Sequence, residues 1–168
     1  DGSSCWSFIK IEDKIPPVIP CKDITLLCAV GNVTPDYLAD SLGIAAGKPV
    51  ITDNCAVQSV SFFDTWKTVA CGDTVNGKKG MGAYLLRTWT AKDPSGNVSS
   101  CQQHIYLERR HADQLFFPAD TIVSCENPLT DPAHTGAPYF KDFGRSFPVF
   151  PGGNSCEINA IFADEVIP

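Results

Sequence analysis

The chain has 168 residues, of which 43% are hydrophobic and 19% charged, so it can bury a core and lacks the composition of a disordered protein. Its 13 basic and 19 acidic residues give a net charge of −6, which argues against binding to nucleic acid or anionic membranes, because both attract clusters of Lys and Arg. The apolar runs are too short to span a bilayer. No charged-then-apolar leader opens the chain, so any signal peptide is expected to have been removed or to lie outside it.

Alternation of apolar and polar residues predicts an all-β chain. The predicted strands cover 6–12, 23–29, 57–63, 83–92, 101–108, 120–125 and 157–163. Within 101–108, Cys101, Ile105 and Leu107 fall on one face of the strand, so the sulfur is expected to point into a core. The cysteine and isoleucines of the first segment have the same spacing and the same expected orientation.

Three other local features interrupt the strands. Pro16-Pro17 cannot sit inside a central strand and is predicted to join two units of the chain. A short helix is expected over 35–42, where Thr34 can cap the start and Gly43 can end it. Lys78-Lys79 is predicted to be the solvated tip of a hairpin rather than an anion-binding site.

The eight cysteines are widely spaced and predict disulfides rather than a metal or redox site. They stand at positions 5, 21, 28, 55, 71, 101, 125 and 156, with no C-x-x-C pair. Zinc knuckles and thioredoxin-like sites need such close pairs, because two thiolates must converge on one ion or one bond. Disulfides persist in oxidising compartments, so the chain is expected to be secreted and extracellular.

Comparison of the chain with itself reveals a repeat of about 97 residues. Residues 3–12 (SSCWSFIKIE) resemble residues 99–108 (SSCQQHIYLE), about 96 positions later. Residues 23–28 (DITLLC) likewise resemble residues 120–125 (DTIVSC), about 97 positions later. At this period the chain is expected to hold one complete repeat and part of a second, in tandem.

The repeat predicts three parts. Residues 1–13 are expected to be a terminal strand that belongs to a preceding repeat or subunit. Residues 14–109 form a complete β-sandwich repeat, and 110–168 begin a second, incomplete one that stops before any counterpart of 84–93. The boundary between the two repeats is expected near residues 109–113, with the units arranged lengthwise.

Two motifs resemble a known family. Residues 12–21 (EDKIPPVIPC) resemble the opening, and residues 87–101 (RTWTAKDPSGNVSSC) the closing hairpin, of hyalin-type and related immunoglobulin-like repeats. The combination is similar to the tandem repeats of very large cell-surface adhesins of the Bacteroidota, exported by their gliding-linked secretion system. The resemblance implies tandem immunoglobulin-like β-sandwiches with interstrand disulfides and an adhesive or filamentous role, without catalytic residues. The chain departs from it where 93–97 lacks a cysteine and Phe117-Pro118 replaces Pro20-Cys21.

The repeat also suggests a disulfide pattern. Because Cys28 and Cys55 have counterparts in Cys125 and Cys156, the economical pairs are 28–55 and 125–156. Cys71 would then pair with Cys101, which leaves Cys5 and Cys21. The resemblance to hyalin-type repeats implies a 21–101 bridge instead.

No catalytic motif is present, and the candidate metal ligands are acidic. The nucleophile elbow, the phosphate-binding loop and the dinucleotide glycine pattern are all missing, and His104, His111 and His134 lack a zinc-binding spacing. Acidic residues stand at predicted loop ends, where they can either bind Ca²⁺ or cap turns. They are Asp53, Asp64, Asp73 and Asp93. No cofactor other than calcium is expected.

Several residues are candidates for contact with sugars. Ser41, Thr74 and Thr121 each follow an Asp and precede an aliphatic residue, which resembles the O-glycosylation signal of the Bacteroidota. The Asn-x-Ser/Thr sequons at Asn32 and Asn97 are expected to be incidental. The tryptophans at 6, 66 and 89 are potential sugar-stacking platforms, but the one at 89 alternates along a strand and is expected to anchor a core.

These observations favour a structural or adhesive extracellular repeat that stacks end to end in a surface adhesin or filament. Its expected partners are neighbouring repeats or copies of itself, head to tail, and surface glycans, without nucleic acid or membrane insertion. Residues 3–12 are expected to add a strand to the neighbour through Cys5, Ile9 and Ile11, unless they form a loose leader. The alternative function is a carbohydrate-binding module of a secreted multidomain protein, and a hydrolase has little support.

Overall fold

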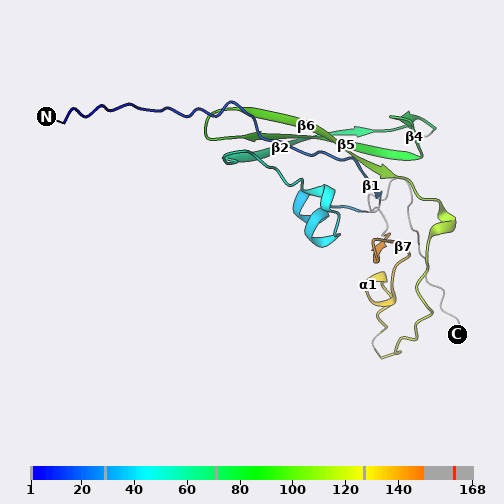
Figure 1. Cartoon of the computed structure of the whole chain (residues 1–168). Helices are drawn as coiled ribbons and strands as arrows, with labels where there is room; N and C mark the ends of the chain where they lie inside the picture. The colour runs from blue at the N-terminus through cyan, green and yellow to red at the C-terminus, as the bar shows by residue number, and fades with distance from the viewer. Residues whose placement is uncertain (1, 29, 71, 127, 150–160, 162–168) are drawn as a thin grey trace.

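The computed structural model describes residues 2–28, 30–70, 72–126, 128–149 and 161. Its regular structure is mostly β-strand in sheets with few helices, as predicted. The elements are β1 (Ile24–Leu27), η1 (Tyr37–Ser41), η2 (Ala45–Gly47), β2 (Ser59–Thr68), β3 (Thr74–Val75), β4 (Lys78–Lys79), β5 (Met81–Lys92), β6 (Val98–Glu108), η3 (Ala112–Gln114), α1 (Pro132–Thr135), β7 (Tyr139–Asp142) and β8 (Arg145–Pro148). Figure 1 shows a long twisted sheet with an extended N-terminal arm at one end and the C-terminal part below the other end.

The main sheet has four strands in the order β1-β6-β5-β2. β6 pairs in parallel with β1 and antiparallel with β5, and β5 pairs antiparallel with β2. Alternate residues of β5, including Leu85 and Trp89, are buried on one face of the sheet. In the neighbouring strand β6, Ile105 pairs with Leu85 and Cys101 pairs with Trp89. The strand order places β6 in the interior of the sheet and leaves β2 at its edge.

The buried face of the sheet packs against two helical turns and a small hairpin. Leu38 of η1 is completely buried in this core, and a Cβ added to Gly47 of η2 would collide with its side chain. The hairpin β7–β8 contributes Phe140 and Phe147 to the same hydrophobic cluster. Part of the segment after residue 110 therefore packs against the first repeat, and the division of the chain into two repeats stays a prediction.

Four predicted strands and the predicted helix are confirmed. The segment predicted at 23–29 contains β1, and those predicted at 57–63, 83–92 and 101–108 overlap the longer strands β2, β5 and β6. The π-helical turn η1 lies within the predicted helix at 35–42. The expected cap is wrong in detail, because the Thr34 hydroxyl donates to Asn32 Oδ1 instead of capping the helix. Gly43 ends the helix at a φ of 70°, a conformation that glycine adopts without strain.

Two predicted strands are wrong, and one lies mostly outside the described residues. Residues 6–12 are extended but belong to no sheet, and residues 120–125 form no strand. Of the strand predicted at 157–163, only Ile161 is described, outside any strand. Together the described residues form one four-stranded sheet and two two-stranded sheets, so the immunoglobulin-like sandwich stays a prediction.

Sequence patterns missed the hairpin of β7 and β8. Its turn places both Phe143 and Gly144 at positive φ, at 46° and 67°. The hairpin of β3 and β4 has the same geometry at Asn76 and Gly77, at 48° and 77°. Such two-residue turns favour Asn-Gly, whereas Phe rarely adopts a positive φ. The Phe143-Gly144 turn is therefore hidden in the sequence. The hairpin of β3 and β4 was expected, but its tip is Asn76-Gly77, and Lys78-Lys79 form the exposed strand β4 instead of the tip.

Candidate functional site

The exposed N-terminal arm becomes attached to the sheet at Asp13, and this joint is the first candidate site. The Asp13 carbonyl oxygen accepts a hydrogen bond of 3.1 Å from Asn97 Nδ2, and the Pro17 carbonyl accepts one of 2.6 Å from the Ser99 hydroxyl. Val18 and Thr52 then form an antiparallel bridge. The proline pair predicted to join two units therefore lies where the chain docks on the sheet.

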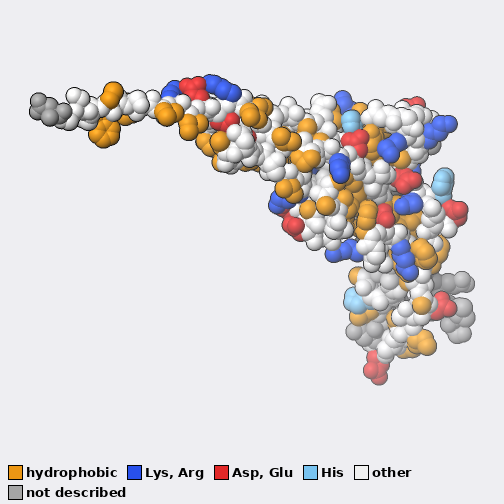
Figure 2. All heavy atoms as spheres, viewed as in Figure 1, with side chains coloured by type: hydrophobic (Ala, Val, Ile, Leu, Met, Phe, Trp, Pro, Cys, Tyr) orange, Lys and Arg blue, Asp and Glu red, His pale blue; other side chains and the backbone are white. Residues whose placement is uncertain are grey.

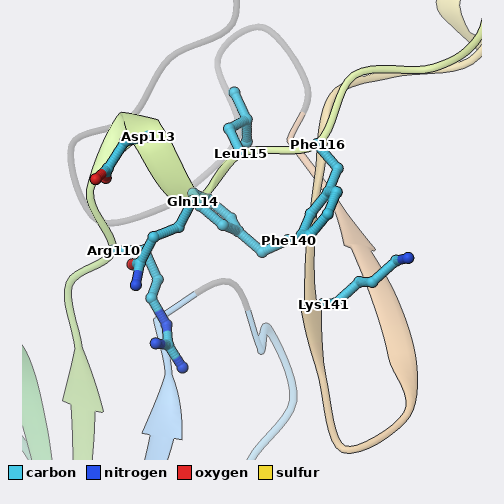
Figure 3. A pocket seen from close by; sticks show the side chains of 7 residues that line it. All are labelled: Arg110, Asp113, Gln114, Leu115, Phe116, Phe140 and Lys141. Carbon is cyan, nitrogen blue, oxygen red and sulfur yellow. The ribbon is translucent and has the colours of Figure 1, made fainter.

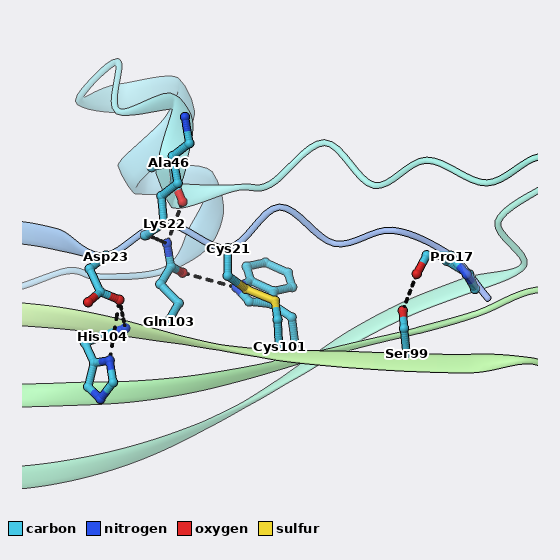
Figure 4. The surroundings of a disulfide bond; sticks show 10 residues. Pro17, Cys21, Lys22, Asp23, Ala46, Ser99, Cys101, Gln103 and His104 are labelled. Atoms are coloured by element: carbon cyan, nitrogen blue, oxygen red, sulfur yellow. Dashed lines mark hydrogen bonds and ion pairs between the residues drawn. A yellow bond between two sulfur atoms is a disulfide. The ribbon is translucent and has the colours of Figure 1, made fainter. Parts of the chain in front are cut away.

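A disulfide between Cys21 and Cys101 closes the joint (Figure 4). This bond makes the predicted pair 71–101 wrong and agrees with the pairing that the hyalin-type resemblance implied. Cys28 is also disulfide-bonded, while Cys55 and Cys125 are free thiols, so the pairs 28–55 and 125–156 are wrong as well. The pairing inferred from the repeat is wrong because two cysteines that occur in both copies need not be bonded to each other. Cys71 and Cys156 themselves lie outside the described residues.

Beside the disulfide, Gln103 is buried and fully hydrogen-bonded. Its Nε2 donates to the carbonyl oxygens of Lys22 and Ala46, at 2.7 and 2.6 Å, and its Oε1 accepts from Trp89 Nε1 at 3.1 Å. Figure 4 shows how this side chain links β6 to the segment before β1 and to η2. Trp89 is therefore a core anchor, as expected, because its ring is buried and its indole nitrogen has a partner.

Three carboxylates meet at the joint. One oxygen each from Asp13, Asp53 and Asp93 lies within 4.8 Å of the other two. The sequence pattern predicted Asp53 and Asp93 as possible calcium ligands but did not include Asp13. Asp13 follows directly after the segment 6–12, so the rule that picks acids at the ends of extended segments could have found it. These residues come from the joint, the loop before β2 and the β5–β6 turn, which the fold brings together.

Each of these carboxylates has an oxygen that backbone and amide donors orient. Asp13 Oδ1 accepts from Ile15 N and Asn54 Nδ2, at 3.0 and 3.1 Å. Asp53 Oδ2 accepts from the backbone nitrogens of residues 55 and 56, at 2.9 and 3.0 Å. Asp93 is completely buried and accepts from Asn97 N and Nδ2, at 2.8 and 2.7 Å. In contrast, Asp13 Oδ2 and Asp53 Oδ1 are buried without any hydrogen-bond partner.

The cluster shifts the pKa values around it. Hydrogen bonds from Ile15 N and Asn54 hold the pKa of Asp13 below its usual value, so this carboxylate is ionised at neutral pH. A hydrogen bond to Asp13 and the nearby negative charges raise the pKa of the Cys55 thiol. The site is therefore a local concentration of negative charge in which the adjacent thiol stays protonated.

The other two proposed calcium ligands lie elsewhere. Asp64 forms a bidentate ion pair with Arg87, with both N–O distances at 2.8 Å. Arg87 is completely buried, donates to the Val33 carbonyl at 2.8 Å and lies over the Phe62 ring. Asp73 is exposed before β3 and does not join the acidic cluster. Asp64 thus neutralises a buried arginine, and only two of the four predicted ligands are near each other.

A second candidate site is the edge of the sheet at β2, whose outer side has no partner strand among the described residues. On the face that buries Leu85 and Trp89, this strand presents Val60, Phe62 and Trp66. All three are exposed, and the Trp66 side chain is 55% accessible. Hydrophobic residues on an unpaired edge strand favour contact with another strand or ligand. Figure 2 shows further hydrophobic side chains along the underside of the sheet and on the N-terminal arm.

The arm itself is the third candidate. Its large apolar residues Trp6, Phe8, Ile9 and Ile11 are all almost fully exposed, and Cys5 is a free thiol. These side chains touch no partner strand in the described part of the chain. The predicted assembly residues are therefore accessible, as strand addition requires.

The remaining candidates lie at the surface. Thr74 and Thr121 are exposed, and Ser41 is half-buried at the end of η1. His104 is on the face opposite Ile105, stacks on Tyr106 and lies 3.4 Å from Asp23. His134 lies 2.7 Å from Asp131. None of the three predicted glycosylation positions is enclosed by the core.

A pocket of about 380 Å³ lies between the segment after β6 and strand β7 (Figure 3). The residues that line it include Arg110, Asp113 and Lys141, and Lys141 Nζ lies 4.7 Å from the centre of the Phe116 ring. The described residues that line it include no Ser, Thr, Cys or His.

In the described part of the chain, no helix is long and apolar enough to cross a membrane. No protein-family model, no curated protein and no solved structure matches this chain.

Proposed function

We propose that the chain is a structural or adhesive extracellular repeat that stacks end to end with neighbouring repeats or with copies of itself. The observation that carries this proposal is the arm. Residues 3–12 resemble residues 99–108, which make up almost all of β6, yet they have no partner strand among the described residues. The disulfide between Cys21 and Cys101 supports an oxidising, extracellular setting.

The alignment of the arm with β6 defines which of its faces is apolar. Ile9 corresponds to Ile105, which is completely buried in the core. Phe8 corresponds to His104, on the opposite and partly exposed face of β6. If the arm occupies in a neighbour the place that β6 occupies here, Ile9 is buried and Phe8 stays near the surface.

The position of β6 explains why such a strand would bind. β6 lies between β1 and β5 and forms hydrogen bonds along both of its edges. An arm inserted at the corresponding place in an open, incomplete repeat of a neighbour gains backbone hydrogen bonds on both sides and buries apolar area worth roughly 25 cal/mol per Å². Because the donor and acceptor surfaces differ, the contact is head to tail and extends into a filament.

A pair of substitutions in the arm tests the proposal. Ile9→Lys places a charge on the face expected to be buried, whereas Phe8→Lys removes at least as much apolar surface from the opposite face. We expect the wild-type chain to form particles whose mass rises with concentration in light scattering. Ile9→Lys and a deletion of residues 1–12 should abolish them, and Phe8→Lys should preserve them.

Two results would contradict the proposal. If the deletion variant forms particles as large as the wild type does, the arm is a loose leader and not a donated strand. If Ile9→Lys and Phe8→Lys reduce assembly equally, the arm associates through its general hydrophobicity without the orientation of β6.

The exposed aromatics of β2 favour a second candidate function, a carbohydrate-binding module. Phe62 and Trp66 lie on one face of β2 and are both exposed, so they can stack against sugar rings. Affinity electrophoresis in gels that contain soluble polysaccharides tests this function. Retardation that Trp66→Ala abolishes and Trp6→Ala leaves unchanged would favour it over assembly.

A further inference from the structure

The acidic cluster at the joint has an arrangement that its own hydrogen bonds do not explain. Asp13, Asp53 and Asp93 bring three negative charges together, yet no described Lys, Arg or His forms an ion pair with any of them. Other carboxylates of the chain have cationic partners, such as Asp64 with Arg87. A cluster of carboxylates without a counter-charge is costly unless a cation binds there.

Buried oxygens without partners point to the same conclusion independently. The Asp13 and Asp53 side chains are half-buried, but Asp13 Oδ2 and Asp53 Oδ1 are themselves shielded from solvent and have no hydrogen-bond partner. Asp93, the third member, is completely buried. An unsatisfied carboxylate oxygen in such a place normally has a donor or a metal ion, because its desolvation is otherwise uncompensated.

The second oxygen of the Asp13 and Asp53 carboxylates is fixed by hydrogen bonds, as is usual for carboxylates that bind a metal ion through their other oxygen. Asp13 Oδ1 and Asp53 Oδ2 each accept two hydrogen bonds, which fix the orientation of the carboxylates. Donors of this kind orient metal-binding carboxylates in proteins and support their affinity. Asp13 and Asp53 thus each combine one oriented oxygen with one unused oxygen, whereas both oxygens of Asp93 accept hydrogen bonds from Asn97.

We propose that Asp13, Asp53 and Asp93 form a calcium site that locks the arm to the sheet. Ca²⁺ prefers oxygen ligands at about 2.4 Å, so one ion spans ligand oxygens as far as about 4.8 Å apart. The three ligand oxygens lie within 4.8 Å of one another. Water and nearby carbonyl oxygens complete the six to eight ligands that Ca²⁺ takes. Asp13 belongs to the joint, so the ion fixes the direction in which the arm leaves the sheet.

The repeat predicts the stoichiometry of this site. At the offset that aligns residues 3–12 with 99–108, Asp13 corresponds to Arg109. A cationic side chain replaces the first ligand there, so the second copy is not expected to bind. The chain should therefore take up one calcium ion, and this expectation does not depend on whether it assembles into filaments.

Calorimetric titration of CaCl₂ into the chelator-treated chain tests the proposal. We expect one ion per chain, with a Kd on the order of 10⁻⁴ to 10⁻³ M, as in extracellular calcium modules. Calcium at about ten times Kd should raise the midpoint of thermal unfolding by about 3–6 °C. Asp53→Asn should weaken binding at least tenfold. Asp73→Asn, an exposed acid outside the cluster, is the matched control and should bind like the wild type.

Limited proteolysis provides a readout that does not depend on the heat of binding. Calcium should slow trypsin cleavage after Lys14 several-fold, because the ion holds the adjacent Asp13 on the sheet. Chymotrypsin cleavage after Trp6 should be unchanged, since this side chain is almost fully exposed. In Asp53→Asn, calcium should no longer protect Lys14.

The proposal fails if the wild type shows neither binding heat nor calcium-dependent stabilisation at 10-fold the upper expected Kd. It also fails if Asp73→Asn loses binding as fully as Asp53→Asn, because the ion would then bind elsewhere or diffusely. Binding of Mg²⁺ without binding of Ca²⁺ would overturn the assignment of the metal. If Asp53→Asn does not fold by circular dichroism, Asp13→Asn serves as the variant instead.

Discussion

Residues 23–28 and 120–125 are similar in sequence but different in structure. The first segment contains β1, which is buried, with Leu26 only 1% exposed. The second forms no strand, and Ile122 at its centre is 100% exposed. Both segments carry β-branched and apolar residues that suit a strand.

The two segments differ in structure because, among the described residues, only the first has a neighbouring strand with which to pair. β1 lies alongside β6 in a parallel pair, and Cys28 N donates to the Glu108 carbonyl oxygen just beyond the ladder. In the described residues, no strand lies beside 120–125. A short strand is marginal in water without a neighbour, so the same local sequence is ordered in one place and irregular in the other. The arm and β6 repeat this contrast between residues 3–12 and 99–108.

Among the variants that test this comparison, removal of the Cys21–Cys101 disulfide should lower the free energy of unfolding the most. The bond closes a loop with a sequence separation of 80 and ties the segment before β1 to β6. A Cys21→Ala/Cys101→Ala double variant should lose about 4 kcal/mol of stability in denaturant unfolding. Cys125→Ala, at an exposed free thiol, should change it by less than about 0.5 kcal/mol. An equal loss in both variants would mean that the segment around Cys125 contributes as much to stability as the disulfide-bonded segment before β1.

A matched pair of truncations sharpens the comparison at equivalent positions. Leu26 corresponds to Val123, which is 36% exposed. Leu26→Ala leaves a cavity in the core and should cost about 3 kcal/mol, whereas Val123→Ala should cost less than about 0.5 kcal/mol. Chemical denaturation of both variants measures the difference. Similar losses would show that 120–125 is packed as well as β1.

The buried ion pair of Asp64 and Arg87 should matter more for stability than an exposed acid does. Asp64→Ala leaves the buried Arg87 guanidinium without its partner and should destabilise the chain by about 2 kcal/mol. The loss is smaller than for a fully buried pair, because the Asp64 side chain is 24% exposed. Asp73→Ala is the control, and thermal unfolding measures both. An unchanged midpoint in Asp64→Ala would mean that Val33 and Phe62 alone satisfy the guanidinium.

The smallest expected effect concerns Asp131, which caps α1 in the second region. A hydrogen bond with His134 holds the pKa of Asp131 below its usual value of 3.8. The stability that ionised Asp131 contributes is therefore complete above pH 3.8 and is lost as the pH falls through the lower pKa of the folded state. In His134→Ala, the pKa of Asp131 should rise, as an NMR titration of the carboxyl group measures. An unchanged pKa would assign the shift to the backbone donors of α1.

Much of the main sheet was predictable from local patterns. The alternation in β5 and β6 identifies both strands and their buried faces, because a sheet with one covered face requires that period. The Asn-Gly turn likewise marks the β3–β4 hairpin, whereas the Phe143-Gly144 turn of β7–β8 carries no comparable signal. The acidic cluster was half predictable, since Asp53 and Asp93 stand at strand ends but their meeting with Asp13 depends on how three segments dock.

The sequence by itself determined a chain of mostly β-strands with a disulfide-bonded body and an internal repeat, because composition, alternation and cysteine spacing are local properties. Only the tertiary structure decided that Cys101 bonds Cys21, that Asp64 neutralises Arg87 and that Asp13 joins the acidic cluster. It also decided which copy of each repeated segment became a strand. Backbone pairing and charge pairing need two partners, and the second partner is supplied by residues far away in the chain.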